Sequence, residues 1–270
     1  MVKLAGVSPT QVGTFTRDGF LIVPQLFAAA EIDELRLVSQ RDREMQDASL
    51  PVLDAAGRIA KLTVWNDAGD DIYGRFARSR RVVEIAQQLL GDEVYHYHSK
   101  LSFKEPRVGG AWEWHQDYGY WYDNGCLFPN MLSALTAIDR CDRENGCVQV
   151  LRGSHLMGRL THLMSGTQTG ADPERVGVAL ERLELVHAEL EPGDTLFFHC
   201  NLLHASGPNE SDRARWTLIT AYNARSNDPY KDSEHPRYTP LTTVADGDLL
   251  AGLEPAGARQ FIQNQHAEGR

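Results

Sequence analysis

Three side chains that can bind a metal ion stand out, and two of them are only two residues apart. His115 and Asp117 lie in Trp114-His115-Gln116-Asp117, and His204 follows far downstream. In an extended segment, residues two apart point to the same side, so one distant imidazole can complete a face of three ligands. Two histidines and one carboxylate with open positions opposite are the ligand set of non-haem Fe(II) oxygenases. The spacing therefore predicts iron-dependent oxidation chemistry.

The surroundings of this triplet strengthen the interpretation. A His-x-Asp triplet alone is weak evidence, because ten histidines and many aspartates make it easy to meet by chance. Here a glycine-rich approach at Gly109-Gly110 leads into a stretch from Trp112 to Trp121 that is crowded with aromatic residues. Aromatic side chains around a few polar groups are typical of a water-poor ligand pocket.

An arginine downstream of His204 predicts a second, anionic ligand beside the metal. Arg215 opens an alternating segment eleven residues after His204, so the two can lie side by side across a hairpin-like return. Its fork-shaped guanidinium is suited to hold a carboxylate with two hydrogen bonds, and the hydroxyl of Ser206 can add a third. Lys104 is an alternative partner for an anion, but we expect it to be solvated, as lysine usually is.

The elements that must position these residues change in type along the chain. The first part predicts helices over 8–15, 28–46 and 79–90 and a short strand over 19–24. From residue 93 onward, turn residues separate short strands, expected at 94–103, 131–138, 147–151, 185–190, 194–198 and 215–222. A helix or long loop is expected at 171–182, and a terminal helix or frayed tail at 257–270. Several short strands in succession favour an antiparallel sandwich or barrel.

Length, composition and charge limit the class of protein. At 270 residues with 42% hydrophobic and 24% charged residues, the chain has the material for one globular domain with a sizeable core. The net charge of −10 argues against binding to nucleic acid. No apolar run has the length of a secretory signal or a membrane span. We therefore expect a cytoplasmic protein with a small-molecule substrate and no membrane or nucleic-acid partner.

The combination of motifs resembles the phytanoyl-CoA dioxygenase family of Fe(II)/2-oxoglutarate oxygenases. The resemblance covers roughly residues 13 to 240. It rests first on His115, Asp117, His204, Ser206 and Arg215, and then on Phe103-Lys104-Glu105-Pro106, Glu144-Asn145-Gly146, Gly153-Ser154-His155 and Tyr222-Asn223.

This resemblance implies a fold and a reaction. The fold is mainly β with flanking helices (α+β), a double-stranded β-helix or cupin-like jelly roll. We expect one domain over 1–270, with a helical part over about 1–92, a jelly-roll core over about 93–225 and a C-terminal loop and tail over 226–270. In such enzymes Fe(II) is held by the two histidines and the aspartate, and 2-oxoglutarate chelates the iron. Its far carboxylate meets the arginine and serine, and reaction with O₂ yields succinate, CO₂ and a hydroxylated small molecule.

Further site residues follow from the resemblance and from strand parity. Loose alignment with the ectoine hydroxylase branch of the family implies that His98 and Ser102 contact 2-oxoglutarate. We expect Tyr118 and Trp121 to line the substrate pocket. On a straight strand Trp121 shares the face of the ligands and Tyr118 does not, but a loop that begins after Asp117 changes this parity. The polar segment 226–236 is a candidate lid or an inert surface loop.

Three alternatives are weighed against this interpretation. Related halogenases carry a small residue in place of the carboxylate, so Asp117 favours hydroxylation over halogenation. A cupin-like metal enzyme that does not use 2-oxoglutarate has no need of Arg215 at this distance from His204. A non-catalytic jelly-roll binding module is expected to have lost the triad, which is intact here. The substrate stays open among acyl-CoA thioesters, amino acids, ectoine and secondary metabolites, and the lack of a Lys/Arg cluster for CoA phosphates tilts the choice away from CoA.

Overall fold

The chain begins with helices and short strands and then continues mainly in strands. The computed structural model describes residues 6–165, 168–251 and 261–262. Its helices are α1 (Pro9–Asp18), α2 (Ala29–Arg41), α3 (Arg43–Asp47), α4 (Ile72–Ala77), α5 (Arg80–Leu90), α6 (Tyr118–Trp121) and α7 (Pro173–Arg182), with 3-10 turns η1 (Ser154–Met157), η2 (Arg225–Asn227) and η3 (Asp246–Asp248). Its strands are β1 (Phe20–Val23), β2 (Leu50–Leu53), β3 (Ile59–Trp65), β4 (Val94–Lys104), β5 (Trp112–His115), β6 (Met131–Ala137), β7 (Val148–Leu151), β8 (His162–Ser165), β9 (Gln168–Ala171), β10 (Leu185–Ala188), β11 (Thr195–His199), β12 (His204–Ser206) and β13 (Arg215–Ala224).

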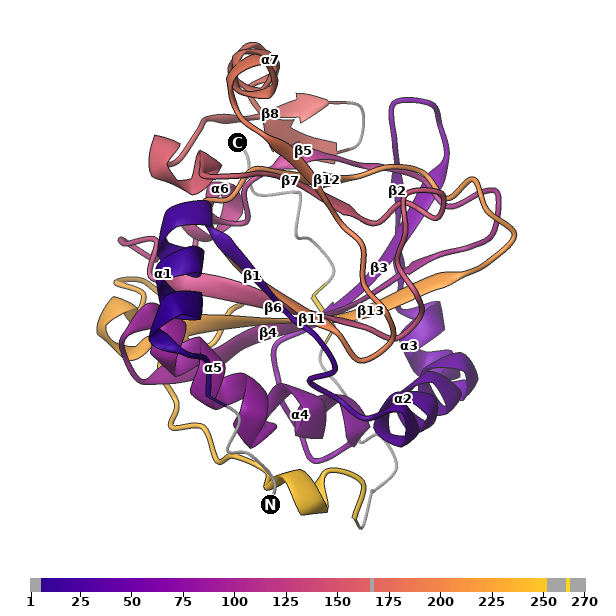
Figure 1. Ribbon diagram of the computed structural model, residues 1–270, viewed down its shortest axis with the longest axis vertical. Helices are drawn as coiled ribbons and strands as arrows, with labels where there is room; N and C mark the ends of the chain where they lie inside the picture. The colour runs from indigo at the N-terminus through magenta and orange to yellow at the C-terminus, as the bar shows by residue number, and fades with distance from the viewer. Residues whose placement is uncertain (1–5, 166–167, 252–260, 263–270) are drawn as a thin grey trace.

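Two antiparallel sheets face each other, and helices cover the outer side of the larger one (Figure 1). The larger sheet has the order β1-β11-β6-β13-β4-β3-β2, and the smaller has the order β10-β7-β12-β5. The hairpin β8-β9 pairs separately and contacts β5. Helices α1, α2, α4 and α5 lie on the side of the larger sheet that faces away from the smaller sheet (Figure 1). This is the jelly-roll arrangement that the sequence predicts.

Strict alternation along the strands of the larger sheet separates two cores. On β11, Phe197 packs into the cluster that includes the helices, while Leu196 and Phe198 pack into the cluster between the sheets. On β6, Leu132 faces the helices and Leu135 faces the interior in the same way. Because side chains point alternately to the two faces of a strand, every second residue of β6, of β11 and of the segments Lys100–Lys104 and Arg215–Ile219 faces the interior. A register shift between Ala221 and Tyr222 interrupts this alternation in the β4–β13 pair.

Local sequence signals explain where the N-terminal helices begin and end. Ser8 caps α1 by accepting a hydrogen bond from the backbone of Gln11, and Gly19 ends it in the left-handed region at φ 82°. The single helix predicted over 28–46 is divided in two. Asp42 leaves the helical conformation and its carboxylate accepts from the backbone N–H of Met45, so a new helix, α3, begins there.

The strand pairings place the chemically interesting residues opposite one another. In the β4–β13 pair, Lys104 lies opposite Arg215 and Lys100 lies opposite Ile219. In the β5–β12 pair, His115 lies opposite His204. The register of β12 against β5 shifts between His204 and Ser206, which is the behaviour of a β-bulge and changes the direction in which neighbouring side chains point.

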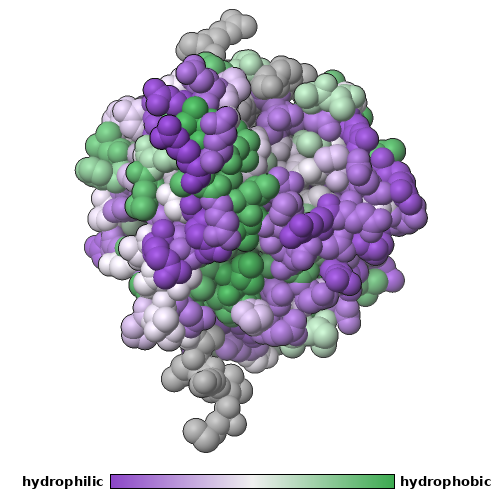
Figure 2. All heavy atoms as spheres, turned by 45° about the horizontal axis from the view of Figure 1, so that its top comes forward, coloured by the Kyte–Doolittle hydropathy of each residue, from purple (hydrophilic) through white to green (hydrophobic). Residues whose placement is uncertain are grey.

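The face above the smaller sheet carries apolar and polar side chains side by side. Figure 2 shows a band of hydrophobic atoms across the middle of this face with hydrophilic atoms on both sides. Exposed apolar residues on β8 and α7 include Met164 and Val178. Among the described residues, no helix combines the length and the apolar character required to cross a lipid bilayer.

Candidate metal centre

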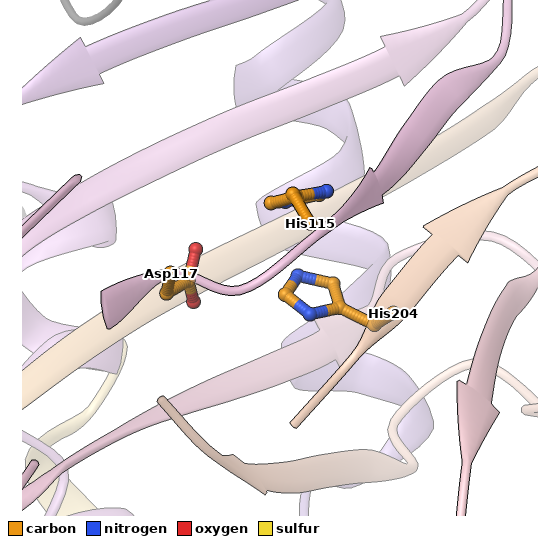
Figure 3. A group of neighbouring side chains, drawn as sticks. All are labelled: His115, Asp117 and His204. Carbon is orange, nitrogen blue, oxygen red and sulfur yellow. The ribbon is translucent and has the colours of Figure 1, made fainter. Parts of the chain in front are cut away.

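The three predicted metal ligands meet at one point inside the jelly roll. One ligand atom from each of His115, Asp117 and His204 lies within 4.8 Å of the other two, and among the described residues this is the one such group of His, Cys, Asp or Glu side chains. The two imidazole ring centroids are 4.1 Å apart because the residues lie opposite each other on β5 and β12. Figure 3 shows the carboxylate of Asp117 turned toward the ring of His204 from the segment that follows β5. The arrangement leaves one side of the group facing the cavity.

Both histidines are held in the tautomer that a metal ligand requires. The Nδ1 of His115 lies 2.7 Å from the carbonyl of Glu113, and the Nδ1 of His204 lies 2.9 Å from the carbonyl of Leu202. A carbonyl only accepts, so each Nδ1 must donate its hydrogen and each Nε2 keeps a free lone pair. Burial, and then the charge of the neighbouring His204, hold the pKa of His115 well below its usual value. Burial also lowers the pKa of His204, so both rings are neutral near pH 7.

Asp117 is kept ionised although it is buried. Burial acts to raise its pKa, but the charge of Lys100, electrostatic interactions with the two neighbouring imidazoles and a hydrogen bond from Ser133 together lower the pKa to about 2. The hydroxyl of Ser133 donates to Oδ2 of Asp117 at 2.8 Å, and the ammonium of Lys100 lies 3.4 Å from Oδ1. An ionised carboxylate with one firmly held oxygen is ready to bind a cation.

Gln116 fixes the backbone between the two ligands. Its side-chain amide donates to the carbonyls of Gly158 and Asn201 at 2.8 and 2.7 Å, and its oxygen accepts from the backbone of Leu160. The side chain of Gln116 points away from the triad. Its hydrogen bonds therefore fix the backbone of the turn after β5 on the side opposite the metal ligands proposed below. Gly119 completes the turn, since an added Cβ would lie 2.1 Å from the ring of His162.

A pair of buried cations lies farther along the same interior face. Lys104 and Arg215 are cross-strand neighbours, with 0% and 2% of their surface exposed. The ammonium of Lys104 donates to Oγ of Ser206 at 2.6 Å, and Nη1 of Arg215 donates to the same oxygen at 3.2 Å and to the carbonyl of Gly146 at 2.6 Å. Gly146 has φ 75°, and an added Cβ would lie 2.2 Å from the carbonyl of Gly207. Only glycine allows the turn to approach this closely.

These two cations fit an anion that the protein itself does not supply. Neither forms an ion pair with any described residue, and Nε of Arg215 is buried without a hydrogen-bond partner. Like charges opposite each other across two strands are destabilising, and burial followed by the charge of Arg215 lowers the pKa of Lys104 well below its usual value. The hydroxyl of Thr217, two residues along β13, is also buried without a partner. Arg215 and Thr217 both line the cavity, so a carboxylate placed there could accept hydrogen bonds from them, whereas Lys104 already donates to Ser206 and Gly207.

A cavity of about 180 Å³ connects the triad with Arg215. Its inner walls are apolar side chains of both sheets, namely Leu135, Val148, Phe198 and Ile219, together with the hydroxyls of Ser102, Ser206 and Thr217. We call the part of the lining that includes the exposed residues Asp123 and Glu234 the mouth; it consists of aromatic, polar and charged residues, namely Lys100, Trp112, Tyr120, Trp121, Asp123, Asn124, His162, Gln168, Thr169, Glu234 and His235. The inner walls come mainly from strands, and the mouth includes turns and loops.

The structure corrects three expectations about single residues. Lys104 is fully buried rather than solvated, because it lies on the interior face of β4 opposite Arg215. Tyr118 does not line the cavity; β5 ends at His115 and α6 begins at Tyr118, so its hydroxyl turns away and donates to the carbonyl of Cys126 at 2.9 Å. His98 lies outside the cavity lining, beside Trp121 and His235.

Other predicted residues are found where the sequence suggested. Ser102, Ser206, Arg215 and Trp121 all line the cavity. The segment 226–236, considered as a lid or an inert loop, contributes Glu234 and His235 to the mouth. The expectation of a tail over 257–270 falls almost entirely outside the described residues.

Sequence reasoning missed several residues that hold or line the site. Lys100 and Ser133 contact Asp117, Gln116 holds the backbone between His115 and Asp117, and Tyr120 and His162 line the cavity. One signal was available for Lys100. It stands two residues before Ser102 and four before Lys104 on a strand, so all three share a face. Ser133 had no signal, because its role depends on how two distant strands are placed.

Comparison with known proteins gives a consistent result. The phytanoyl-CoA dioxygenase (PhyH) family matches residues 15–217. The chain is 26% identical over 256 residues to L-proline trans-4-hydroxylase of Streptomyces griseoviridis, covering 89% of this chain and 94% of that protein. It is 28% identical over 238 residues to the ectoine dioxygenase of Sphingopyxis alaskensis, covering 83% of this chain and 78% of that protein.

A solved structure supports the same relationship. The crystal structure of EctD from S. alaskensis with bound Fe superposes with a TM-score of 0.74 at 25% sequence identity, and the match covers 88% of each chain.

Proposed function

The chain belongs to the phytanoyl-CoA dioxygenase family, and we propose that His115, Asp117 and His204 hold the iron at which it oxidises its substrate. The protein is an Fe(II)/2-oxoglutarate-dependent dioxygenase that hydroxylates a small organic molecule while 2-oxoglutarate is converted to succinate and CO₂. The observation that carries the residue assignment is that the triad and the guanidinium of Arg215 line one cavity.

In this proposal the far carboxylate of 2-oxoglutarate binds to Arg215 and Ser206, with Lys104 behind the serine. The support is that Arg215 forms no ion pair with any described residue and that its Nε is buried without a hydrogen-bond partner. Ser102 and Thr217 line the path from this point to the triad. Their hydroxyls can hydrogen-bond the cosubstrate, whereas His98, outside the cavity, is not part of the proposed site.

The bound iron supplies the activation of O₂ and the oxidation of a C–H bond, and the protein supplies position, charge and exclusion of water. His115 and His204 present Nε2 lone pairs because their Nδ1 hydrogens are committed to carbonyls. Asp117 stays anionic through Ser133 and Lys100. The apolar inner walls limit water around the reacting groups, which strengthens every electrostatic contact there. The carboxylate of Asp117 favours oxygen transfer over halide transfer.

We propose a small polar substrate rather than a CoA thioester. The curated relatives act on L-proline and on ectoine, which are small molecules that carry a carboxylate and ring nitrogen. Among the described residues that line the mouth, the carboxylates of Asp123 and Glu234 are present, and the group of basic side chains that CoA phosphates require is not.

We take the chain as a single catalytic domain, which is supported by the packing of α5 and α1 against strands of the larger sheet. We place the enzyme in the cytoplasm, which is supported by four free, buried cysteines.

Formation of succinate tests the proposed function. The purified protein is incubated with Fe(II), 2-oxoglutarate and air, in the presence of a set of small amino acids and cyclic amines. We expect succinate in at least one mixture, and none when iron, 2-oxoglutarate or oxygen is left out. An iron-loaded protein that consumes no 2-oxoglutarate with any compound would overturn the proposal. Zinc in place of iron serves as the control, because it fits the same ligands but does not activate oxygen.

A further inference from the structure

Three polar side chains of β4 share its interior face, and only two of them belong to the proposed cosubstrate site. Lys104 meets Ser206, and Ser102 lies opposite Thr217 in the same register. Lys100 is the third. It lies four residues from Lys104, which at roughly 3.3 Å per residue is about 13 Å along the strand. Its charge is therefore at the mouth side of the triad, away from the anion site at Arg215.

The contacts of Lys100 leave its charge available to a ligand. Its ammonium lies 3.4 Å from Oδ1 of Asp117, which is long for a charge-assisted hydrogen bond, and 5.8 Å from the ring centroid of Trp121. Asp117 is already held more closely by Ser133, and in the proposed function its charge serves the iron. The side chain of Lys100 is 13% exposed and lines the cavity, so this cation is largely desolvated.

The charges around the cavity are arranged as a dipole. The charges of Fe(II) and of the 2-oxoglutarate dianion cancel each other. The side chains of the protein therefore set the net charge inside the cavity. Among the residues that line the cavity near the triad and beyond it, the cations Lys100 and Arg215 outnumber the carboxylate of Asp117. At the mouth, the carboxylates of Asp123 and Glu234 are exposed to solvent and line the same cavity.

We propose that Lys100 binds the carboxylate of the substrate, and that the substrate is a small amino acid or cyclic imino acid whose ammonium faces Asp123 and Glu234. This inference rests on the proposed function and deepens it. A carboxylate at Lys100 lies beside the triad, so carbons a few bonds away from it are within reach of the iron site. The apolar walls of Trp121, Leu62 and Trp112 suit the hydrocarbon part of such a molecule.

Lys100→Met removes the charge and keeps the length of the side chain. Lys61→Met is the matched control, because Lys61 also has an aromatic neighbour, Phe103, and an acidic one, Glu105, but is 39% exposed and outside the cavity. Lys100→Arg tests rescue by a second cation. The probes are L-proline, L-pipecolic acid, L-leucine and L-lysine, each supplied beside its carboxamide, and the readout is succinate formed per minute.

We expect the wild type to accept at least one of these acids and to prefer it to its amide. In Lys100→Met the KM for that acid rises by roughly 10- to 100-fold, the range expected when a hydrogen bond between charged groups is removed. The preference for acid over amide disappears, and the KM for 2-oxoglutarate stays near the wild-type value. Lys100→Arg recovers part of the loss, and Lys61→Met behaves as wild type.

Several results would overturn the inference. Equal use of acid and amide by the wild type does so without any variant, so the test does not depend on the folding of Lys100→Met. A rise in the KM for 2-oxoglutarate alone in Lys100→Met would show that Lys100 binds the cosubstrate and not the substrate. If the Fe(II)–2-oxoglutarate complex forms anaerobically and no probe acid is turned over, the substrate class is wrong while the enzyme class stands. If that complex does not form, the proposed function itself has failed.

Discussion

The inner half of the cavity and its mouth are built in different ways. The inner half is made by side chains of regular strands, and its polar groups are buried and tied to neighbours, as in the contacts of Ser133 with Asp117 and of Lys104 with Ser206. The mouth takes much of its lining from α6 with the turn that follows it, from the β8-β9 hairpin, and from the segment around Glu234 and His235. Several of its polar groups are exposed.

This difference separates what fixes the reaction from what selects the substrate. Groups on paired strands keep their positions to within small shifts, which a metal ion and a chelating cosubstrate require. Groups on turns and loops change with little cost to the fold, which suits a surface that adapts to different substrates. We therefore expect substitutions in the inner half to abolish chemistry, and substitutions at the mouth to change substrate affinity.

The largest effect is expected for Asp117→Ala. Loss of an iron ligand should lower the rate of succinate formation by more than about 100-fold, because loss of an outer hydrogen-bond partner of a ligand already costs about 10- to 100-fold. Iron content and activity are measured together. Asp212→Ala is the control, since Asp212 is 80% exposed and forms only a surface ion pair with Arg107. Full activity in Asp117→Ala would remove this residue from the iron site.

Arg215→Gln should act on the cosubstrate. Removing the guanidinium leaves the far carboxylate of 2-oxoglutarate without its charged partner, and a loss of about 2 to 5 kcal/mol raises the KM for 2-oxoglutarate roughly 30-fold or more. Arg213→Gln is the matched control two residues away, because its side chain is 53% exposed and points to surface carboxylates. An unchanged KM for 2-oxoglutarate in Arg215→Gln would show that the cosubstrate does not bind at Arg215. It would favour a cupin-like enzyme that does not use 2-oxoglutarate.

Low pH should destabilise the folded protein through its buried histidines. Burial lowers the pKa of His96 to about 4, and burial with the charge of His155 lowers the pKa of His199 to about 4. The unfolded chain binds protons at about 6.5, so stability is lost as pH falls from about 6.5 toward 4, by an amount on the order of a few kcal/mol.

Chemical denaturation at several pH values between 7.5 and 4.5 measures this loss. His199→Gln should flatten the dependence relative to the wild type. A free energy of unfolding that does not change over this range would show that these histidines are not held neutral by the fold.

The smallest effect is expected at the mouth. His235→Ala removes a ring that stacks on Tyr97 at 4.5 Å between centroids and lies beside His98. Because His235 lines the mouth and not the inner half, we expect a rise of a few-fold in the KM for the substrate and no change in the KM for 2-oxoglutarate. Steady-state kinetics with either compound varied gives both values. A loss of activity as large as that of Asp117→Ala would remove the distinction between the two halves.

The sequence predicted the inner half better than the mouth, and the reason is physical. Strand periodicity predicted that His115 and Asp117 lie together, although only His115 is on the strand and Asp117 begins the turn into α6. The strand predicted at 131–138 is found as β6 at Met131–Ala137. Arg215 was recognisable because its spacing from His204 places it on the next strand. The position of Lys104 was not predicted, because burial of a lysine depends on its cross-strand partner.

Other features depend on contacts that no local pattern records. The strands β2 and β3 went unpredicted, because Pro51 and Lys61 break the usual apolar pattern. Pairing stabilises both strands, since β2 pairs with β3 and β3 pairs with β4. Tyr118 was misplaced because the chain leaves the strand conformation after His115 and turns into α6 at Asp117. Glu234 and His235 could not be predicted to line the mouth, because no local pattern shows where the polar segment 226–236 folds back onto the cavity.

Anaerobic titration of 2-oxoglutarate into the Fe(II)-loaded protein tests the central claim most directly. Chelation of iron by the 2-oxo acid gives a visible charge-transfer band. The proposed site predicts that this band appears and saturates in the wild type, requires a much higher 2-oxoglutarate concentration in Arg215→Gln, and is unaffected in Arg213→Gln. Absence of the band in an iron-loaded wild type, or equal affinities in the two arginine variants, would contradict it.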